Sequence, residues 1–248
     1  MMGTLLVTGG SRGIGAAVAR LAAARGFDIA LSYRGNKAAA DQVVADIAAQ
    51  GRKALAIQAD VGVEADVARL FGDAIAAFVR IDVLVNNAGI LEAQARLEDM
   101  SVERWDRVLR TNVIGTFLCA KAAVRHMSTR HGGDGGVIIN LSSRASGLGS
   151  PNEFIDYAAS KGAMDTMTVG LAKETARDGI RVNAVRPGLI ETEMHASGGM
   201  PDRVAKLQDN VPIGRGGTAD EVAEAILWLA SEQSSYVTGA LLDVSGGR

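Results

Sequence analysis

Tyr157 and Lys161 stand four residues apart in the segment Tyr157-Ala158-Ala159-Ser160-Lys161. On a helix this spacing places a phenol and an ammonium on the same face. A free phenol has a pKa of about 10, and each unit by which that pKa falls requires about 1.4 kcal/mol of preference for the phenolate. A neighbouring cation can supply part of that preference. The pair is therefore a candidate acid/base, although an amphipathic tyrosine beside a solvated lysine has the same pattern.

A glycine-rich segment, residues 8–15, follows an apolar run and precedes a helical pattern. Glycines at Gly9, Gly13 and Gly15 allow a tight turn and close approach of the backbone to a pyrophosphate, whose charge a helix N-terminus stabilises. The spacing is G-x-x-x-G-x-G, whereas the general dinucleotide fingerprint is G-x-G-x-x-G. A purely structural turn is the alternative, but the strand-turn-helix context favours a dinucleotide site.

Two arginines bear on which dinucleotide binds. An acidic residue about 20 positions after the glycines is typical of NAD sites. Here the second apolar run ends in Tyr33-Arg34-Gly35 and has no carboxylate at its tip. Arg34, and Arg12 within the glycine turn, are suited to a 2′-phosphate because a guanidinium matches phosphate oxygens. The sequence predicts NADP, with NAD as the alternative, unless both arginines are solvent-exposed without a role.

Other polar residues mark the same edge of the predicted sheet. Ser142 and Ser143 follow an apolar run at residues 137–141, where open α/β sheets place their ligands. A hydroxyl there can stabilise a developing alkoxide, although serines also simply end strands. Asn112 interrupts a helical pattern in spite of its poor helix propensity, and it is either functional or exposed and neutral. Asn86 and Asn87 are consistent with a ligand site or with a turn.

Short apolar runs alternate with helical patterns along the chain. Strands are predicted over residues 4–8, 29–33, 54–59, 83–85, 137–141, 181–185 and 240–244. Helices are predicted over residues 13–25, 38–50, 65–78, 102–126, 157–177 and 220–230. This alternation predicts an α/β protein: a single Rossmann-type domain over residues 1–248, whose doubly wound parallel sheet has about seven strands and helices on both faces. The least regular part, around residues 188–217, is expected to form a lid over the site or an ordinary surface excursion.

Composition excludes several classes of protein. Of 248 residues, 48% are hydrophobic and 22% charged, and a formal net charge of -2 gives no electrostatic case for nucleic acid or membrane partners. Cys119 is the sole cysteine, so there is no intramolecular disulfide and no cysteine-based metal cluster, and we expect it to be a packing residue. The histidines lack metal-ligand spacing, and no metal is predicted. Met1 and Met2 lead into the first strand without a signal sequence, and no apolar run is long enough to cross a membrane, so a cytoplasmic location is expected.

In this order, the motifs resemble those of the classical short-chain dehydrogenase/reductases from residue 4 to the C-terminus. The matching motifs are the turn from Thr8 to Gly15, Asn86-Asn87-Ala88-Gly89, Asn112, Ser143, Tyr157, Lys161 and Pro187-Gly188. The chain is most similar in appearance to bacterial 3-oxoacyl carrier-protein reductases and glucose 1-dehydrogenase-like members. The resemblance implies an enzyme that acts on CH-OH/C=O groups, most often as a homotetramer.

The resemblance also implies residue roles. Tyr157 would be the acid/base, Lys161 would lower its pKa and bind the nicotinamide ribose, Ser143 would polarise the substrate carbonyl, and Asn112 would help to hold a water in a proton relay. The predicted cofactor contacts in the turn are Gly9, Ser11, Arg12, Gly13, Ile14 and Gly15, with Arg34 at the 2′-phosphate. The resemblance implies Asp60 and Val61 at adenine, Asn86, Ala88 and Gly89 on the adenosine side, Tyr157 and Lys161 at the nicotinamide end, and Pro187, Gly188, Ile190 and Thr192 at the carboxamide.

One departure concerns spacing. Ser143 precedes Tyr157 by fourteen positions, whereas thirteen is commoner in the family, so the segment from Ser150 to Glu153 is expected to carry an extra residue. Ser143 is a better match than Ser142 or Ser146. The expected function is an NAD(P)-dependent oxidoreductase whose substrate is a 3-oxoacyl thioester, a sugar or a small ketone. The alternative is a catalytically silent dinucleotide-binding sensor or scaffold.

Overall fold

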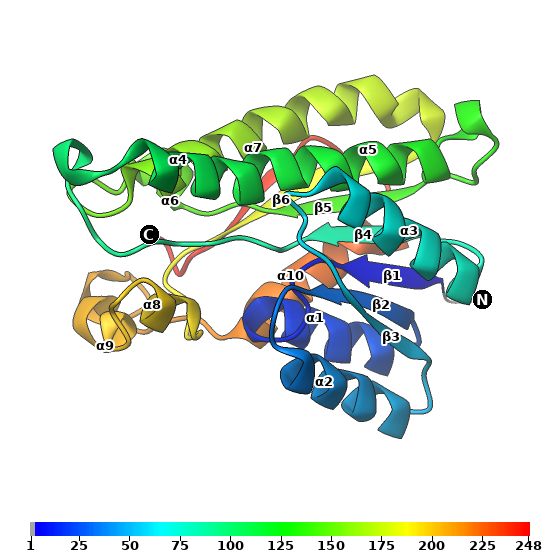
Figure 1. Ribbon diagram of the computed structural model, residues 1–248, viewed down its shortest axis with the longest axis horizontal. Helices are drawn as coiled ribbons and strands as arrows, with labels where there is room; N and C mark the ends of the chain where they lie inside the picture. The colour runs from blue at the N-terminus through cyan, green and yellow to red at the C-terminus, as the bar shows by residue number, and fades with distance from the viewer. Residues whose placement is uncertain (1–2) are drawn as a thin grey trace.

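The computed structural model describes residues 3–248, except for the side chain of His195 (Figure 1). The predicted lack of a signal sequence at Met1 and Met2 lies outside the described residues. In this part of the chain, seven strands form one sheet in the order β3-β2-β1-β4-β5-β6-β7, and all neighbouring strands are parallel. The strands are β1 Thr4–Val7, β2 Asp28–Tyr33, β3 Ala54–Gln58, β4 Val83–Asn86, β5 Gly136–Leu141, β6 Ile180–Pro187 and β7 Leu241–Val244. The predicted fold class is confirmed.

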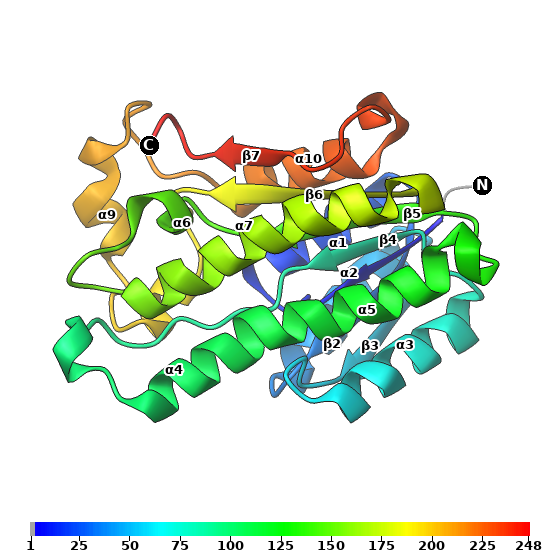
Figure 2. The same cartoon turned by 90° about the horizontal axis from the view of Figure 1, so that it is seen from above.

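Helices cover both faces of this sheet (Figures 1 and 2). One layer consists of α1 Gly13–Ala24, α2 Lys37–Ala49 and α10 Ala219–Ala230, and the other of α3 Glu64–Phe78, α5 Gly115–Met127 and α7 Ile155–Thr175. Leu5 and Val7 pack on the first layer and Leu6 on the second, because successive strand residues point to opposite faces. Burial on both faces explains why the strands read as continuous apolar runs.

From β1 the chain first adds strands on one side of the sheet, β2 and then β3, and afterwards adds β4 to β7 on the other side. The order of the strands therefore reverses between β1 and β4. In open α/β sheets, the carboxyl ends of the strands on either side of such a reversal form a crevice for ligands. The glycine turn after β1 and the segment after β4 therefore lie at the two sides of this crevice. The fold alone places the predicted motifs at one edge of the sheet.

The helix expected over residues 102–126 is interrupted. It consists of α4 Val102–Leu109, a π-helical turn Arg110–Ile114 and α5. A π-helical turn contains one residue more than an α-helical turn and is frequent at functional sites. Here it contains Asn112, whose backbone oxygen accepts a hydrogen bond of 2.8 Å from the Thr116 hydroxyl. The sequence prediction of a continuous helix was wrong at this point because local periodicity does not register one inserted residue.

The segment around residues 188–217 contains more structure than its irregular sequence suggested. It forms the short helices α8 Met194–Ser197 and α9 Arg203–Leu207. Ile190 and Gly217 pair as a parallel bridge, and the Gly217 amide donates to the Leu189 oxygen at 2.9 Å. Figure 1 shows α8 and α9 beyond the arrowheads of the strands. The segment thus leaves and rejoins the scaffold at one point beside the crevice.

Other expectations concern the rest of the chain. Cys119 is 1% exposed, and burial raises the pKa of its thiol to about 12, so it is a packing residue, as expected. None of the helices described in residues 3–248 has the length and apolar character that a membrane crossing requires. Among the described side chains, which leave out that of His195, no group of His, Cys, Asp and Glu is arranged to hold a metal ion.

Candidate active site

A cleft of about 1450 Å³ runs along the carboxyl ends of the strands. Most of the predicted site residues line it: Gly9, Ser11, Arg12, Gly13, Ile14, Arg34, Asp60, Val61, Ala88, Gly89, Ser143, Tyr157, Lys161, Pro187, Gly188, Ile190 and Thr192. Gly15, Asn86 and Asn112 lie outside the lining. The chain thus brings the two groups of motifs, those of the glycine turn and those around Tyr157, into a single cavity.

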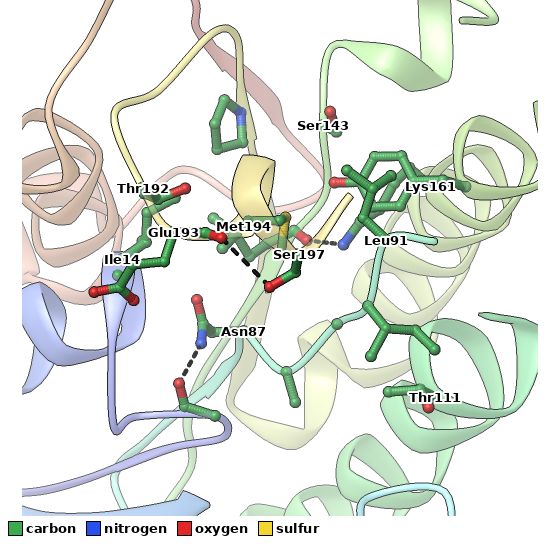
Figure 3. A pocket seen from close by; sticks show the side chains of 18 of the residues that line it. Ile14, Asn87, Leu91, Thr111, Ser143, Lys161, Thr192, Glu193, Met194 and Ser197 are labelled. Carbon is green, nitrogen blue, oxygen red and sulfur yellow. Dashed lines mark hydrogen bonds between the residues drawn. The ribbon is translucent and has the colours of Figure 1, made fainter. Parts of the chain in front are cut away.

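Tyr157 and Lys161 project from the first turns of α7 into this cleft. The Lys161 Nζ lies 5.5 Å from the centroid of the Tyr157 ring. The same Nζ donates a hydrogen bond of 2.6 Å to the Leu141 oxygen at the end of β5 (Figure 3). This bond fixes the ammonium at the carboxyl edge of the sheet. Helical spacing and a strand end together hold the pair in one orientation.

Burial shifts the pKa values of both groups. Burial lowers the pKa of the Lys161 ammonium to about 8, while the charge of Asp165 acts in the opposite direction. Burial raises the pKa of the Tyr157 phenol above its ordinary value of 10.0, and a hydrogen bond with Ser143 acts to lower it. The net direction for Tyr157 is opposite to the one expected from its lysine neighbour, because desolvation disfavours the phenolate more strongly than the hydrogen bond favours it.

We predict that the buried Lys161 ammonium makes stability depend on pH in the alkaline range. Its pKa of about 8 in the folded protein lies below the model value of 10.5, so the unfolded chain binds more protons between these two values. The burial penalty is complete below pH 8 and is relieved as pH rises towards 10.5. Urea unfolding should show the wild type gaining stability relative to Lys161→Met over this interval. Lys173→Met, at an exposed position of α7, should show no such difference.

The structure distinguishes the three candidate serines. Ser143 lines the cleft, and its hydroxyl acts to lower the pKa of the Tyr157 phenol. Ser142 is 2% exposed and its hydroxyl donates to the Lys161 backbone oxygen at 3.2 Å. Ser146 donates to the Ser143 backbone oxygen at 2.8 Å from the short helix α6 Ala145–Leu148. Ser143 is therefore the serine whose side chain meets the phenol, and its role in polarising a carbonyl stays a prediction.

Asn112 lies behind the cleft and is fully buried. Its Oδ1 accepts from the Ile90 amide at 2.8 Å, and its Nδ2 donates to the Ile90 oxygen at 3.1 Å and to the Ser160 hydroxyl at 3.1 Å. A Cβ added at Gly89 would lie 3.4 Å from the Asn112 Oδ1 and 3.8 Å from the Lys161 Nζ. Asn112 thus fixes the segment after β4 close to Lys161, and its predicted part in a water relay stays untested.

The glycine turn has the backbone that its sequence predicts. Gly9 and Gly13 have φ values of 64° and 53°, in the left-handed region that glycine adopts at little cost. Gly15 lies inside α1, where a Cβ would come within 2.5 Å of the Asn87 Nδ2 and of the Gly9 oxygen. Gly15 is therefore required for packing within the turn and does not line the cleft, in contrast to the contact predicted for it.

The two asparagines at the end of β4 lie in different surroundings, and the cofactor contact predicted for Asn86 stays a prediction. Asn86 is 3% exposed and donates to the Asn140 Oδ1 at 2.9 Å, inside the sheet. Asn87 lines the cleft (Figure 3). Its Nδ2 donates to the Thr8 and Gly9 oxygens at 2.8 and 2.9 Å, which holds the glycine turn. Because strand residues alternate faces, only one of two consecutive asparagines can point into the crevice.

The end of the cleft with the glycine turn contains two exposed arginines and the residues predicted to contact adenine. Arg12 and Arg34 are exposed at the end with the glycine turn, and no carboxylate within residues 3–248 forms an ion pair with either. The Asp60 Oδ1 accepts from the Gly62 amide at 2.9 Å, and Val61 packs against Gly115. Thr192, from the excursion at residues 188–217, lies over the turn, since a Cβ added at Gly13 would be 3.7 Å from it.

A buried ion pair beside Tyr157 was missed by sequence reasoning. The Arg104 Nε lies 2.6 Å from the Asp156 Oδ2, and the side chains are 10% and 3% exposed. Arg104 also donates to the Ala93 oxygen at 2.5 Å, and the Asp156 Oδ1 accepts from the Tyr157 amide at 2.9 Å. The pair joins α4, the cleft-lining loop at Ala93 and the start of α7. No motif marks it, because its partners lie 52 residues apart.

Comparison with known proteins identifies the family. Residues 9–248 match the family model described as Enoyl-(Acyl carrier protein) reductase. A short-chain dehydrogenase from Burkholderia cenocepacia, solved with NADP, is 36% identical with a TM-score of 0.90, over 99% of this chain and 97% of that one. The chain belongs to the short-chain dehydrogenase/reductase family.

Relatives within the short-chain dehydrogenase/reductases include both groups suggested by the sequence. The uncharacterised oxidoreductase YgfF of Escherichia coli K12 is 53% identical over the full length of both chains. Glucose 1-dehydrogenase 2 of Bacillus subtilis is 39% identical over 98% of this chain and 93% of its own. A 3-ketoacyl-(acyl-carrier-protein) reductase from Brucella melitensis, solved with NADH, is 35% identical with a TM-score of 0.92, over 99% and 98% of the two chains. The resemblance is confirmed, and the chain is an oxidoreductase of this family.

Proposed function

We propose that this protein is an NADP-preferring carbonyl reductase or alcohol dehydrogenase in which Tyr157 is the acid/base. The observation that carries the proposal is that Tyr157, Ser143 and Lys161 line the same cleft as the glycine turn, with the Ser143 hydroxyl near enough to the phenol to act on its pKa. Two hydroxyl groups that meet at one point can both bind a single substrate oxygen. This arrangement suits the interconversion of a ketone and a secondary alcohol.

The cleft fits a dinucleotide. Side chains at Gly9 and Gly13 would be strained by the positive φ, and their absence lets a pyrophosphate approach the start of α1. The residues that would hold the cofactor are the lining members of the turn, with Asp60 and Val61 at adenine, Ala88 and Gly89 beside the ribose, Lys161, and Pro187, Gly188, Ile190 and Thr192 at the nicotinamide. When bound, the cofactor supplies or accepts the hydride.

The residues of the chain would perform the proton chemistry. Ser143 and Tyr157 bind the carbonyl oxygen, and the phenol donates its proton as negative charge develops there. The Lys161 ammonium, anchored on the Leu141 oxygen with its Nζ 5.5 Å from the centroid of the Tyr157 ring, stabilises the resulting phenolate. In the oxidative direction Tyr157 takes the proton from the alcohol. We propose that residues 188–217 act as the lid that excludes water, since Thr192 already lies over the glycine turn.

We predict that Arg34→Ala weakens NADPH binding about tenfold and leaves NADH binding nearly unchanged, because a charge-assisted bond to the 2′-phosphate is lost. Fluorescence titration with both reduced cofactors would measure this. Arg130→Ala, which alters an arginine with a side chain 71% exposed and outside the cleft lining, is the matched control. Tighter binding of NADH than NADPH by the wild type would contradict the cofactor assignment.

A substrate panel tests the activity itself. Reduced-nicotinamide absorbance would be followed with a 3-oxoacyl thioester, a small ketone, an aldose with the oxidised cofactor, and a 2-enoyl thioester, because the matching family model is described by enoyl reduction. We expect turnover of a carbonyl or alcohol. Turnover of the enoyl thioester alone would refute the carbonyl assignment. Cofactor binding without turnover would instead favour a sensor, an alternative for which the comparisons give no support.

We further propose a homotetramer. Leu109, Ile114 and Phe117 on α4, the π-helical turn and α5 are 41%, 40% and 49% exposed, and large apolar side chains at such positions are suited to an interface between copies. Ala120, three residues after Phe117 on α5, is buried within the subunit. Light scattering would measure the mass in solution, and a monomer would overturn the assembly.

A further inference from the structure

The end of the cleft beyond Tyr157 is mainly apolar. Leu91, Ala93, Leu148, Phe154 and Met194 line it, and Figure 3 shows Leu91 and Met194 around the same cavity as Ser143 and Lys161. Phe154 is the residue that precedes α7, and it lines the same cleft as Tyr157. A substrate whose oxygen meets Tyr157 would place its carbon skeleton among these side chains. This part of the inference rests on the proposed function.

One cation, Arg203 at the start of α9, also lines this end. Glu153 binds it in bidentate form, with 3.0 Å from Nη1 to Oε1 and 2.6 Å from Nη2 to Oε2. The guanidinium lies 5.2 Å from the centroid of the Phe154 ring, and the Arg203 side chain is only 11% exposed. The charge of the Arg203 guanidinium is therefore already compensated. Its two terminal nitrogens bind the two carboxylate oxygens of Glu153, which is the paired geometry that a guanidinium prefers.

Two other arginines of the lining are compensated in the same way. Arg107 lies 2.9 Å from Glu92, and Arg144 lies 3.2 Å from Asp243. The opposite end of the cleft differs, since Arg12 and Arg34 have no ion-pair partner within residues 3–248. Arg12 and Arg34, which suit a cofactor phosphate, thus have no ion-pair partner among the described residues, whereas Arg107, Arg144 and Arg203 are each paired with a carboxylate.

We propose that Glu153, by holding Arg203, makes the substrate end of the cleft select uncharged carbonyl compounds with an apolar skeleton and reject carboxylates. A substrate carboxylate could bind Arg203 only by displacing Glu153, which would leave the Glu153 charge half-buried and without its partner. Such an exchange gains no net ion pair and adds the cost of desolvating the ligand. An uncharged skeleton meets only the apolar wall. Glu153, which lies just before α7 and holds Arg203 of the lid, is therefore a specificity-determining residue of the substrate end of the cleft.

The test compares ligands that differ only in charge. Turnover would be measured with cyclohexanone and 4-oxocyclohexanecarboxylate, and equilibrium binding with cyclohexanecarboxamide and cyclohexanecarboxylate, in the presence of NADPH. We expect the wild type to favour the neutral member of each pair by about tenfold or more. In Glu153→Gln, which frees the Arg203 charge, the ratio should move about tenfold towards the carboxylate.

Matched variants separate this role from a structural one. Arg203→Gln and the double variant Glu153→Gln/Arg203→Gln lack the freed cation, so neither should shift the ratio towards the carboxylate. Thermal unfolding would confirm that each variant is folded. A wild type that prefers the carboxylate would overturn the proposal even if Glu153→Gln did not fold, and so would an unchanged ratio in a folded Glu153→Gln. If neither ketone is turned over, the binding ratios still decide this inference, while the missing turnover counts against the proposed function.

Discussion

Replacing Tyr157 with phenylalanine should lower kcat by about 10²- to 10⁴-fold, because that is the usual contribution of a positioned general acid or base. The ring and the helix remain, and only the phenolic oxygen that meets Ser143 is removed. The affinity for NADPH should stay close to that of the wild type, since the remaining cleft contacts are unchanged. The measurement is steady-state turnover on the best substrate of the panel, together with fluorescence titration of the cofactor.

Tyr236→Phe is the matched control for this result. Tyr236 is 103% exposed on the surface, and the same loss of one oxygen there should leave kcat unaltered. Ser143→Ala removes the hydroxyl that hydrogen-bonds with the phenol and should also slow turnover. If Tyr157→Phe kept a kcat near that of the wild type, Tyr157 would not be the acid/base, regardless of the affinity measured for the cofactor.

The second large effect concerns the ion pair between Arg104 and Asp156. Arg104→Leu should lower the free energy of unfolding by about 3–5 kcal/mol, because it leaves the Asp156 carboxylate buried without a countercharge. The Asp156 side chain is 3% exposed, so solvent cannot replace the guanidinium. Chemical unfolding followed by circular dichroism would measure the loss. Since Asp156 also accepts from the Tyr157 amide, turnover should fall in the fraction that remains folded.

A double replacement distinguishes a lost countercharge from lost packing. Arg104→Leu/Asp156→Leu removes both charges, and its loss of stability should be smaller than that of Arg104→Leu. Lys37→Met breaks an exposed pair with Asp41 on α2 and should change stability little. Equal losses in the single and double variants would show that the charge of Asp156 is not responsible.

The strands were predictable because burial on both faces leaves a continuous apolar run such as residues 137–141, which one sequence window reveals. Helix α9 was not, since its five residues are stabilised by contacts such as Arg203 with Glu153, 50 residues away. The π-helical turn at Asn112 was also missed, because its extra residue does not disturb the surrounding periodicity. Local periodicity is thus sufficient to predict the strands and long helices of the sheet and its layers. The short helices depend on contacts between residues far apart in the sequence, which local periodicity does not reveal.

The candidate site divides in a similar way. Glycines with positive φ and the spacing of Tyr157 and Lys161 are local signals, and most residues predicted from them line the cleft. Which of Asn86 and Asn87 has its side chain in the cleft could not be predicted, because the dipeptide does not reveal the direction in which each side chain points. The upward shift of the Tyr157 pKa depends on burial, and burial is a property of the assembled fold.

The bridge between Ile190 and Gly217 closes the excursion of residues 188–217 at its base. Backbone hydrogen bonds make this closure, including one from the Glu191 amide to the Gly217 oxygen at 2.9 Å. The cost of closing a loop grows only slowly with its length, so segments of other lengths and sequences can be joined at the same base. The segment can therefore be replaced during evolution without changing the sheet that carries it. Related proteins can in this way come to accept different substrates while they keep the same sheet and the same cofactor cleft.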